Sequence, residues 1–554
     1  MRAVRFAPLL LTLAASPIAA QDAAPTLPSV AAAPHRVAPR LIVVISVDQF
    51  SADLFAEYRN RFTGGFARLL DGAVFPSGYQ SHSATETCPG HSTIMTGDRP
   101  SRTGMIANDW YDFKGARPGL VYCMEDERIP GTTPDNYVAS DVHLRVPTLG
   151  ERMKNADPRV RIVSVAGKDR AAIQLGGHKI DDLWFWRDGK GFISYAGRAV
   201  PAAVTRANAT AAAEIARGGP AMAEPAWCRS IDRPVMAQGH PVGDGRFARK
   251  PKSEGQWKAS PAFDTAIIDL AIQRAQDLKL GRGPAIDVLA VGASATDYVG
   301  HTFGTEGAEM CIHLAALDKS LGRLFAALDK TGVDYVVALT ADHGGNDIPE
   351  RERERAAPTA DRVAAALTPR TMGSVIAKEW GLDGQLLYGA VNGEVWIDPK
   401  LKPADRDRVL AEAVRRYRAD PQVAAVFTRD ERAAAPLPSG PPETWSLLQR
   451  SRAAFAPDRS GDFAVYLKPR ITPIAPVSTP SGTIATHGSI WDYDRRVPIL
   501  FWRRGMAGFE QPLSVETVDI MPTLAALIGF PLAPGEVDGR CLDLDGGPGS
   551  TCPQ

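Results

Sequence analysis

Three aspartate and three histidine side chains in this sequence have the types and spacing of a metal site. The six residues are Asp48, Asp297, His301, Asp342, His343 and His487. Asp297 and His301 are four residues apart, so on a helix they share one face. Any one of these histidines alone is more often an ordinary surface or core residue. Together the six exceed what one zinc ion needs and suit two.

A second chemical pattern is the run TETCPGHSTIMTG at residues 85–97. Pro89 suits the first position of a helix, which predicts Thr87 or Cys88 as its N-cap. Backbone N–H groups and the helix dipole make such a turn an anion site. Capping alone is the commoner use of a threonine here. Beside bound Zn²⁺, however, the pKa of a hydroxyl is lowered, so a hydroxyl at this turn is a candidate nucleophile.

Short β-branched runs end beside these polar residues, with amphipathic helical patterns between them. Strands are expected at 41–47, 161–167, 286–294, 333–340 and 497–502, and helices at about 264–280, 308–328 and 515–528. This alternation predicts an α/β fold with a mainly parallel central sheet and helices on both faces. Because ligands bind at the carboxyl ends of parallel strands, the site is expected at that edge.

Two segments are interpreted as caps inserted into one catalytic domain spanning residues 40–554. Residues 180–260 are rich in Gly, Pro, Ala and Trp and show little periodicity. Residues 370–475 predict a small unit of their own: a hairpin with the turn Asn392-Gly393, a helix at about 403–418, and strands at 422–428 and 463–467. The charge run at 351–355 is interpreted as a solvated face.

The N-terminus has the pattern of a secretory signal: Arg2 and Arg5, an apolar run, then small residues, with cleavage expected after Ala20. Residues 21–39 are predicted to be a disordered lead-in. No later apolar run has spanning length, so a periplasmic or secreted protein without a membrane span is expected. Lys+Arg and Asp+Glu number 63 each, which excludes a general attraction to nucleic acid or anionic lipid.

All six cysteines follow the signal, in a compartment where disulfides persist. Cys541 and Cys552 flank a Gly-rich loop and are expected to close it, and Cys123 with Cys228 is a further candidate pair. Cys311 lies on an apolar helix face and is predicted to be a buried thiol. Connectivity cannot be derived from sequence.

The combined motifs resemble those of the alkaline phosphatase superfamily. They are Asp48, TCPGHSTIMTG, Asp297-x3-His301, Asp342-His343-Gly344, the late THG with His487, and the helical pattern VDIMPTLAALIG at 518–529. Within this superfamily the sequence is similar to the threonine-nucleophile, phosphate-irrepressible alkaline phosphatases. The similarity rests on TCPGHS, ANDWYD (107–112) and GKDR (167–170).

This resemblance implies a role for each matching residue. Thr87 would be the nucleophile, and the phosphoryl oxygens would be contacted by Asn108, Lys168 and Arg170. One zinc would be held by Asp297, His301 and His487, and the other by Asp48, Asp342, His343 and Thr87. Charge on the phosphoryl oxygens needs a positive clamp, which Lys168 and Arg170 can supply. Without such a role these two would be solvated loop cations.

Other residues compete for these roles. Cys88 is the rival nucleophile, since sulfatases of the superfamily use a modified cysteine in C-x-P-x-R. Here proline follows directly, and Ser92 stands where arginine is required. His82 and His91 lack acidic companions and are interpreted as structural, although His91 could line the pocket.

The sequence thus predicts an exported two-zinc alkaline phosphatase that hydrolyses small-molecule phosphate monoesters through a phospho-threonine. The element Lys168-Asp169-Arg170 favours monoesters, with diesters as a secondary activity. The alternatives are a nucleotide pyrophosphatase/phosphodiesterase and, from another class, a non-catalytic zinc- or phosphate-binding module. Monomer and homodimer remain open.

Overall fold

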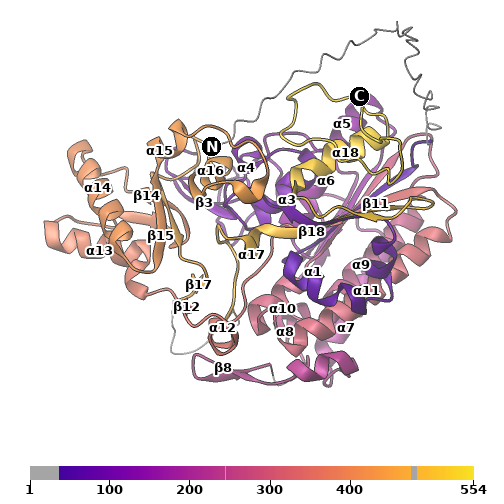
Figure 1. Ribbon diagram of the computed structural model, residues 1–554, viewed down its shortest axis with the longest axis horizontal. Helices are drawn as coiled ribbons and strands as arrows, with labels where there is room; N and C mark the ends of the chain where they lie inside the picture. Colours follow the sequence, from indigo (N-terminus) through magenta and orange to yellow (C-terminus); the bar gives the residue numbers. More distant parts are fainter. Residues whose placement is uncertain (1–36, 244, 476–482, 554) are drawn as a thin grey trace, which may run out of the picture. The chain divides into compact units, whose positions relative to one another are not determined.

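The computed structural model describes residues 37–243, 245–475 and 483–553. Within these residues ten strands form a central sheet (Figure 1). The strands are β1 (Leu41–Val47), β2 (Ala73–Tyr79), β5 (Ile162–Ala166), β6 (Asp182–Arg187), β7 (Gly191–Ile193), β10 (Asp287–Ala293), β11 (Tyr335–Thr340), β18 (Arg496–Arg503), β19 (Phe509–Glu510) and β20 (Val515–Glu516). Their order is β19-β2-β18-β11-β1-β10-β5-β6-β7, and β20 also pairs with β2.

The middle of this sheet is parallel, as the sequence predicts. Strand β1 pairs in parallel with β10 and β11, β10 with β5, and β5 with β6. Strand β18 instead runs antiparallel to β11 and to β2. Because β18 is reversed, its first residues lie at the edge where β1, β10 and β11 end. A residue just before β18 can therefore meet residues that follow the parallel strands.

Helices cover both faces of the sheet, which confirms the predicted fold class. All residues of β1 are buried, and alternate side chains enter two different cores. One core includes α9 (Pro261–Asp277) and α11 (Ala308–Asp329); the other includes α3 (Thr87–Thr96), α5 (Leu149–Ala156), α6 (Asp169–Gly176) and α18 (Ile520–Leu527). Figure 1 shows the two groups on opposite sides of the sheet. A strand buried on both faces needs an unbroken apolar run, which LIVVISV nearly provides.

The segment expected to be one helix at 515–528 is more complex. It begins as β20, continues as the 3₁₀ turn η5 (Thr517–Asp519) and becomes helical only at α18. The start is extended because Val515 and Glu516 pair with β2.

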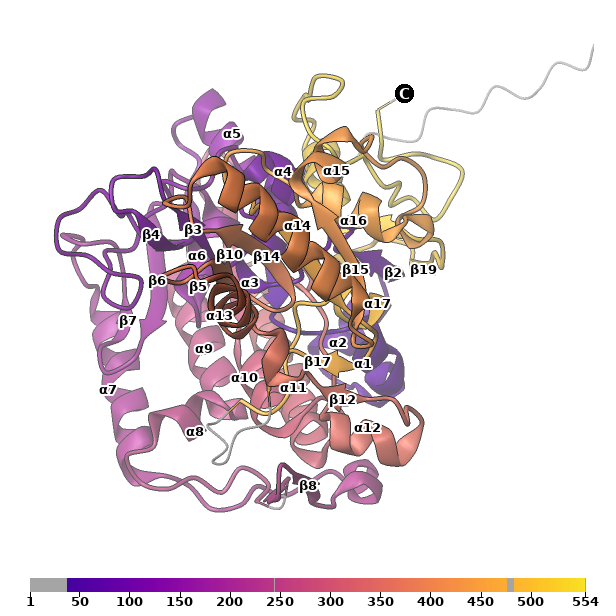
Figure 2. The same ribbon diagram turned by 90° about the vertical axis from the view of Figure 1, so that its left-hand side faces the viewer.

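The two predicted insertions have different structures. In 180–260, β6 and β7 extend the central sheet, and only then follow α7 (Ala202–Arg217), the hairpin of β8 (Val235–Ala237) and β9 (His240–Val242), and α8 (Glu254–Lys258). In 370–475 a separate antiparallel sheet forms from β13 (Leu387–Gly389), β14 (Gly393–Ile397), β16 (Phe463–Leu467) and β15 (Val423–Thr428). Helices α13 (Pro369–Trp380) and α14 (Pro403–Ala419) pack on it (Figure 2). Gly393 opens β14, so the hairpin turn lies before it, at 390–392.

The disulfides correct part of the cysteine prediction. Cys541 pairs with Cys552 as expected, but the other two bonds are Cys88–Cys123 and Cys228–Cys311. The predicted Cys123–Cys228 pair is therefore wrong, and Cys311 is not a free thiol. The reason is tertiary: η2 (Ala226–Ile231) packs on α11 and brings Cys228 within 5.8 Å of Cys311, Cα to Cα.

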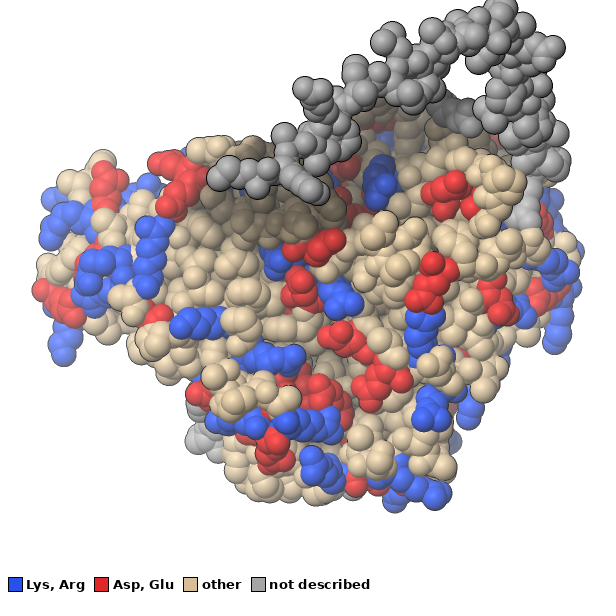
Figure 3. All heavy atoms as spheres, viewed as in Figure 1, with Lys and Arg blue, Asp and Glu red and all other residues tan. Residues whose placement is uncertain are grey.

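No helix in the described part of the chain is long and apolar enough to cross a membrane. On the face drawn in Figure 3, Lys and Arg are interspersed with Asp and Glu, consistent with the balanced composition. The predicted signal at 1–20 and most of the lead-in at 21–39 lie outside the described residues.

Candidate active site

The six aspartate and histidine residues meet at the carboxyl edge of the central sheet as two triads. One triad is Asp297, His301 and His487; the other is Asp48, Asp342 and His343. Asp48 directly follows β1, and Asp342 and His343 come just after β11. The helix α10 (Ala295–Phe303), which starts after β10, carries two more residues, and the loop before β18 supplies His487. Within each triad the potential ligand atoms lie within 4.8 Å of one another.

In the first triad the aspartate faces two imidazole nitrogens. Asp297 Oδ1 lies 3.2 Å from His301 Nε2 and 3.4 Å from His487 Nε2. Both rings use Nδ1 elsewhere: His301 donates to the Ala485 carbonyl and His487 to the Thr85 carbonyl, each at 2.8 Å. Because Nδ1 is held by a carbonyl, each ring points its Nε2 toward the carboxylate, the arrangement typical of a metal-binding histidine.

The second triad repeats this arrangement with deeper burial. His343 Nε2 lies 3.2 Å from Asp342 Oδ2 and 3.6 Å from Asp48 Oδ1, and His343 Nδ1 donates to the Gly344 carbonyl at 2.8 Å. All three facing atoms are buried, and His343 Nε2 and Asp48 Oδ1 have no hydrogen-bond partner. Buried polar atoms without partners are rare in native proteins, so this set fits a cation between them.

Lys168 joins the two triads. It is the N-cap of α6, after β5, and its Nζ lies 2.7 Å from Asp48 Oδ2 and 2.6 Å from Asp297 Oδ2. Burial lowers the pKa of Lys168, but the charges of the two carboxylates outweigh it and raise the pKa above its ordinary value. Three buried carboxylates against one ammonium still leave an excess of negative charge, which is costly in a dry site.

The pKa values of the site reflect both burial and the neighbouring charges. Burial, reinforced by Asp342, raises the pKa of Asp48 well above its ordinary range. Burial lowers the pKa of His487, yet its hydrogen bond to Asp297 and that charge raise it to about 9. Burial lowers the pKa of His343 to about 3, which keeps its Nε2 free as a ligand. Cations in the triads would supply the missing charge.

Helix α3 begins differently from the prediction. Its first residue is Thr87, its N-cap is Glu86, and Pro89 is the third residue rather than the first. Proline is accepted there because the first-turn N–H groups have no helical partner. Cys88 N–H is already used by Asn108 Oδ1, at 2.8 Å, and Pro89 has no N–H. The expected backbone anion site is thus reduced to the N–H of Thr87, and further donors for an anion would come from side chains.

Two residues of α3 seat its first turn against the second triad. His91 Nδ1 lies 3.0 Å from the Thr87 carbonyl and 3.1 Å from Asp342 Oδ2. A Cβ on Gly90 would lie 2.0 Å from the Asp342 carbonyl oxygen, so only glycine fits. Thr87 Oγ1 is buried without a hydrogen-bond partner. His91, interpreted from the sequence as structural, thus contacts the second triad; its spacing of four from Thr87 is the signal that points to this turn.

The predicted phosphoryl contacts lie around this turn. Because Asn108 Oδ1 accepts from Cys88, its Nδ2 is the end left to donate. Arg170 Nη1 donates to the Tyr122 hydroxyl at 3.3 Å, and that hydroxyl donates to Asp169 at 2.8 Å. The rival nucleophile is excluded, because the sulfur of Cys88 is bonded to Cys123.

Asp/His metal sets beside a hydroxyl serve hydrolysis and transfer of phosphoryl and related groups, so fold and site are those of an α/β hydrolase with a candidate metal centre. The comparisons with known proteins narrow this class. The chain belongs to the type I phosphodiesterase / nucleotide pyrophosphatase family, whose model matches residues 42–490, within the alkaline phosphatase superfamily.

Three named relatives are alkaline phosphatases. The chain is 53% identical over 528 residues to PhoK of Sphingomonas sp, covering 95% of this chain and 94% of PhoK. It is 48% identical over 533 residues to PhoD of Zymomonas mobilis, covering 93% and 89%. The solved structure of wild-type PafA, 25% identical, matches with a TM-score of 0.75 over 91% of this chain and 98% of PafA. A PafA variant with one threonine, one asparagine, one lysine and one arginine replaced matches with 0.76.

Proposed function

We propose that this protein is an alkaline phosphatase that hydrolyses small-molecule phosphate monoesters through a covalent phospho-threonine at Thr87, with two zinc ions as cofactors. The names of PhoK, PhoD and PafA support the activity. The observation that carries the mechanism is the pair of triads with unpartnered buried atoms next to a helix whose first hydroxyl has no partner.

The chemistry of the donors fits zinc, whose protein ligands are imidazole nitrogens and carboxylate oxygens. One ion would be held by Asp297, His301 and His487, and the other by Asp48, Asp342, His343 and Thr87. When bound, the ions would lower the pKa of the nucleophile and polarise the substrate's oxygens. The backbone carbonyls that accept from each Nδ1 keep every Nε2 aimed at its triad.

The proposed reaction has two steps, formation of the phospho-threonine and its hydrolysis. Thr87 Oγ1 attacks phosphorus and gives its proton to water, the bond from phosphorus to the ester oxygen breaks, and the leaving oxygen takes a proton back from water and departs as the alcohol. Water next attacks the phospho-threonine, which releases phosphate and restores the Thr87 hydroxyl. His91 and Gly90 hold the nucleophile's turn against Asp342 throughout, which keeps the hydroxyl in line.

Three side chains are proposed to hold the phosphoryl oxygens. Asn108 offers Nδ2, and Arg170 offers its guanidinium fork. Lys168 has three protons, of which Asp48 and Asp297 take two, so one remains for an oxygen. The threonine, asparagine, lysine and arginine replaced in the PafA variant have the same types and order as Thr87 and these three residues.

This clamp favours monoesters, because the extra anionic oxygen of a monoester gains most from added positive charge. The name of the matched family favours a second candidate, a nucleotide pyrophosphatase/phosphodiesterase. A diesterase shares the nucleophile and the triads, so we propose diester hydrolysis as a secondary activity.

A substrate panel tests the proposal. Zinc-loaded protein, a chelated sample and Thr87→Ala are assayed on p-nitrophenyl phosphate, bis-p-nitrophenyl phosphate and p-nitrophenyl sulfate, with the metal content of each sample measured. We expect the highest kcat/KM for the monoester, with both controls inactive and Thr87→Ala retaining metal. A higher value for the diester or the sulfate would overturn the monoester assignment, and no turnover at all would indicate a binding module.

Export is part of the proposal. The signal at residues 1–20 would be cleaved after Ala20, which delivers the protein to the periplasm or the medium. The part of 180–260 that follows β7 and the segment at 370–475 are proposed to cap the catalytic domain and to influence which ester enters. N-terminal sequencing of the exported protein tests the first point; a mature chain that begins at Met1 would contradict it.

A further inference from the structure

Glu86 stands directly before Thr87, and its carboxylate has a partner outside its own helix. It is the N-cap of α3, but its side chain makes no capping hydrogen bond. Instead Glu86 Oε2 accepts the backbone N–H of Asn108 at 2.7 Å. A half-buried carboxylate so close to an anion-binding site needs an explanation, because it would repel the substrate.

Asn108 also contacts Cys88, the residue on the other side of Thr87. Its Oδ1 accepts from Cys88 N–H at 2.8 Å, and its carbonyl accepts from Cys123 N–H at 2.9 Å. Cys123 is in turn bonded to Cys88. We name these four residues, Glu86, Cys88, Asn108 and Cys123, the clasp. Its links join the residues on both sides of Thr87 to the segment that carries Asn108.

The clasp holds both the backbone and the side chain of Asn108. Glu86 accepts from its backbone N–H, and Cys88 N–H binds its amide oxygen, so the amide nitrogen points away from Cys88. The amide nitrogen Nδ2 is then left to donate in a direction set relative to Thr87. A donor aimed at the developing charge is effective only when it is held in place before the reaction.

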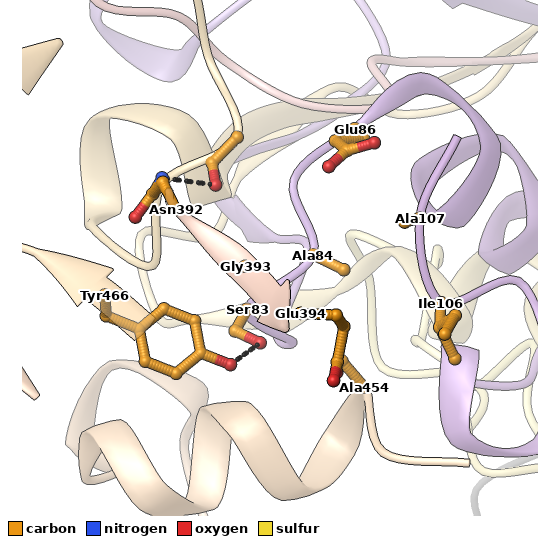
Figure 4. Close-up of a pocket in the computed structure, with 11 residues that line it drawn as sticks. Ser83, Ala84, Glu86, Ile106, Ala107, Asn392, Gly393, Glu394, Ala454 and Tyr466 are labelled. Atoms are coloured by element: carbon orange, nitrogen blue, oxygen red, sulfur yellow. Dashed lines mark hydrogen bonds between the residues drawn. The ribbon is translucent and has the colours of Figure 1, made fainter. Parts of the chain in front are cut away.

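The surroundings of Glu86 argue against direct contact with substrate from this side. The cavity lined by Glu86, Ala107, Asn392 and Gly488 has a volume of about 30 Å³. That is enough for a water molecule but far below the several hundred Å³ typical of ligand pockets. Figure 4 shows Glu86 and Ala107, the neighbour of Asn108, on adjacent segments beside this cavity. A Cβ on Gly488, which follows His487, would lie 3.8 Å from Glu86 Cγ.

We infer that Glu86 is a positioning residue for the phosphatase reaction: through the clasp it sets the place of Asn108 relative to Thr87. The inference rests on the proposed function, because Asn108 acts on a phosphoryl group only if the protein is a phosphatase. The role is geometric, since it needs an acceptor at the position of Oε2 but no negative charge.

Three substitutions separate geometry from charge. Glu86→Gln keeps an acceptor of the same length, so kcat/KM should stay within about threefold of the wild type. Glu86→Asp keeps the charge but shortens the reach, and Glu86→Ala removes the acceptor; each should lower kcat/KM about 10- to 100-fold. Ser83→Ala is the matched control, because Ser83 lines the same cavity but bonds Tyr466 instead of Asn108 (Figure 4). It should remain within about twofold.

A double-mutant cycle with Asn108→Ala decides whether Glu86 acts through Asn108. We expect Glu86→Ala to add little once Asn108 is alanine, and both single variants to raise the inhibition constant of inorganic phosphate. The inference would be overturned if the fold-losses in kcat/KM of the two single variants multiply in the double variant. A loss in Glu86→Gln as large as in Glu86→Ala would also overturn it. If Glu86→Ala fails to fold, Glu86→Asp takes its place in the cycle.

Failure of the proposed function would look different. If Asn108→Ala leaves kcat/KM for the monoester unchanged, Asn108 makes no phosphoryl contact and the inference falls with that role. If Asn108→Ala is impaired but Glu86→Ala is not, the phosphoryl contact stands and only the positioning role is wrong. Thermal unfolding of each variant identifies effects that come from stability alone.

Discussion

The two triads contain the same kinds of atoms but differ in burial and support. The side chains of Asp48, Asp342 and His343 are 0–1% exposed, and all three residues follow strands of the central sheet. In the other triad His301 is 21% and His487 is 8% exposed, and these two come from a helix and a loop.

This difference bears on which triad is better suited to hold the nucleophile and which to hold the leaving group. The buried triad contacts the nucleophile's helix through His91 and is supported by rigid strands, as precise placement of Thr87 requires. In the more exposed triad the His301 side chain is partly accessible to solvent, and we propose that the alcohol leaves and water enters on this side. The difference in burial agrees with the proposed division, in which Thr87 lies at the buried triad and the leaving group at the more exposed one.

The largest expected effect comes from breaking the buried triad. Asp342→Asn removes a charged ligand candidate and a partner of His91, so kcat/KM should fall by roughly 10³-fold or more, with loss of about one metal equivalent. Steady-state kinetics and elemental analysis of the same sample provide the measurement. Full metal content with normal activity would show that this triad holds no ion.

A smaller effect is expected from the exposed triad. His301→Ala should lower kcat/KM roughly 100-fold, and added zinc should restore part of it, because Asp297 and His487 remain. Activity titrated against free zinc checks this. If added zinc restores no more activity to His301→Ala than to Asp342→Asn, the two triads do not differ in the way proposed.

The link between nucleophile and buried triad should be weaker still. His91→Phe keeps a ring in the core but removes the contact to Asp342, so we expect about a 10-fold loss of kcat/KM with both metal equivalents retained. Loss of metal in this variant would mean that His91 supports binding of the ion more than placement of Thr87.

The smallest effect on activity should come from a change away from both triads. Replacing Cys228 and Cys311 by serine removes a bond between η2 and α11, and it should lower the free energy of unfolding by about 2–4 kcal/mol. The value of kcat/KM should stay within about twofold. Denaturant titration and kinetics on one preparation separate the two quantities; a large kinetic defect would connect this region to the site.

Much of the site could be predicted because strand ends are visible in the sequence. Asp48 and the Asp342-His343 pair each follow an apolar run closely, and parallel strands end at one edge. The position of His487 required the antiparallel direction of β18, which no local pattern reveals. The sequence shows His487 just before a predicted strand, but it does not show the direction of that strand.

Other features depended on tertiary contacts and could not be predicted. The position of Lys168 between two aspartates and the seating of His91 both require the packed sheet edge. The charge run at 351–355 was interpreted as solvated, yet Arg351 is 3% exposed and pairs with Asp347 at 2.7 Å. The sequence alone does not show that a charged residue such as Arg351 is buried, because its acidic partner is not identified by any pattern.

The most direct test of the central claim is the stereochemical course at phosphorus. A phosphate monoester made chiral with oxygen isotopes is turned over in the presence of an acceptor alcohol, and the configuration of the transferred phosphoryl group is determined. Attack by Thr87 followed by attack on the phospho-threonine gives two inversions, so the account predicts retention. Inversion would mean a single direct displacement, and the covalent threonine mechanism would be wrong.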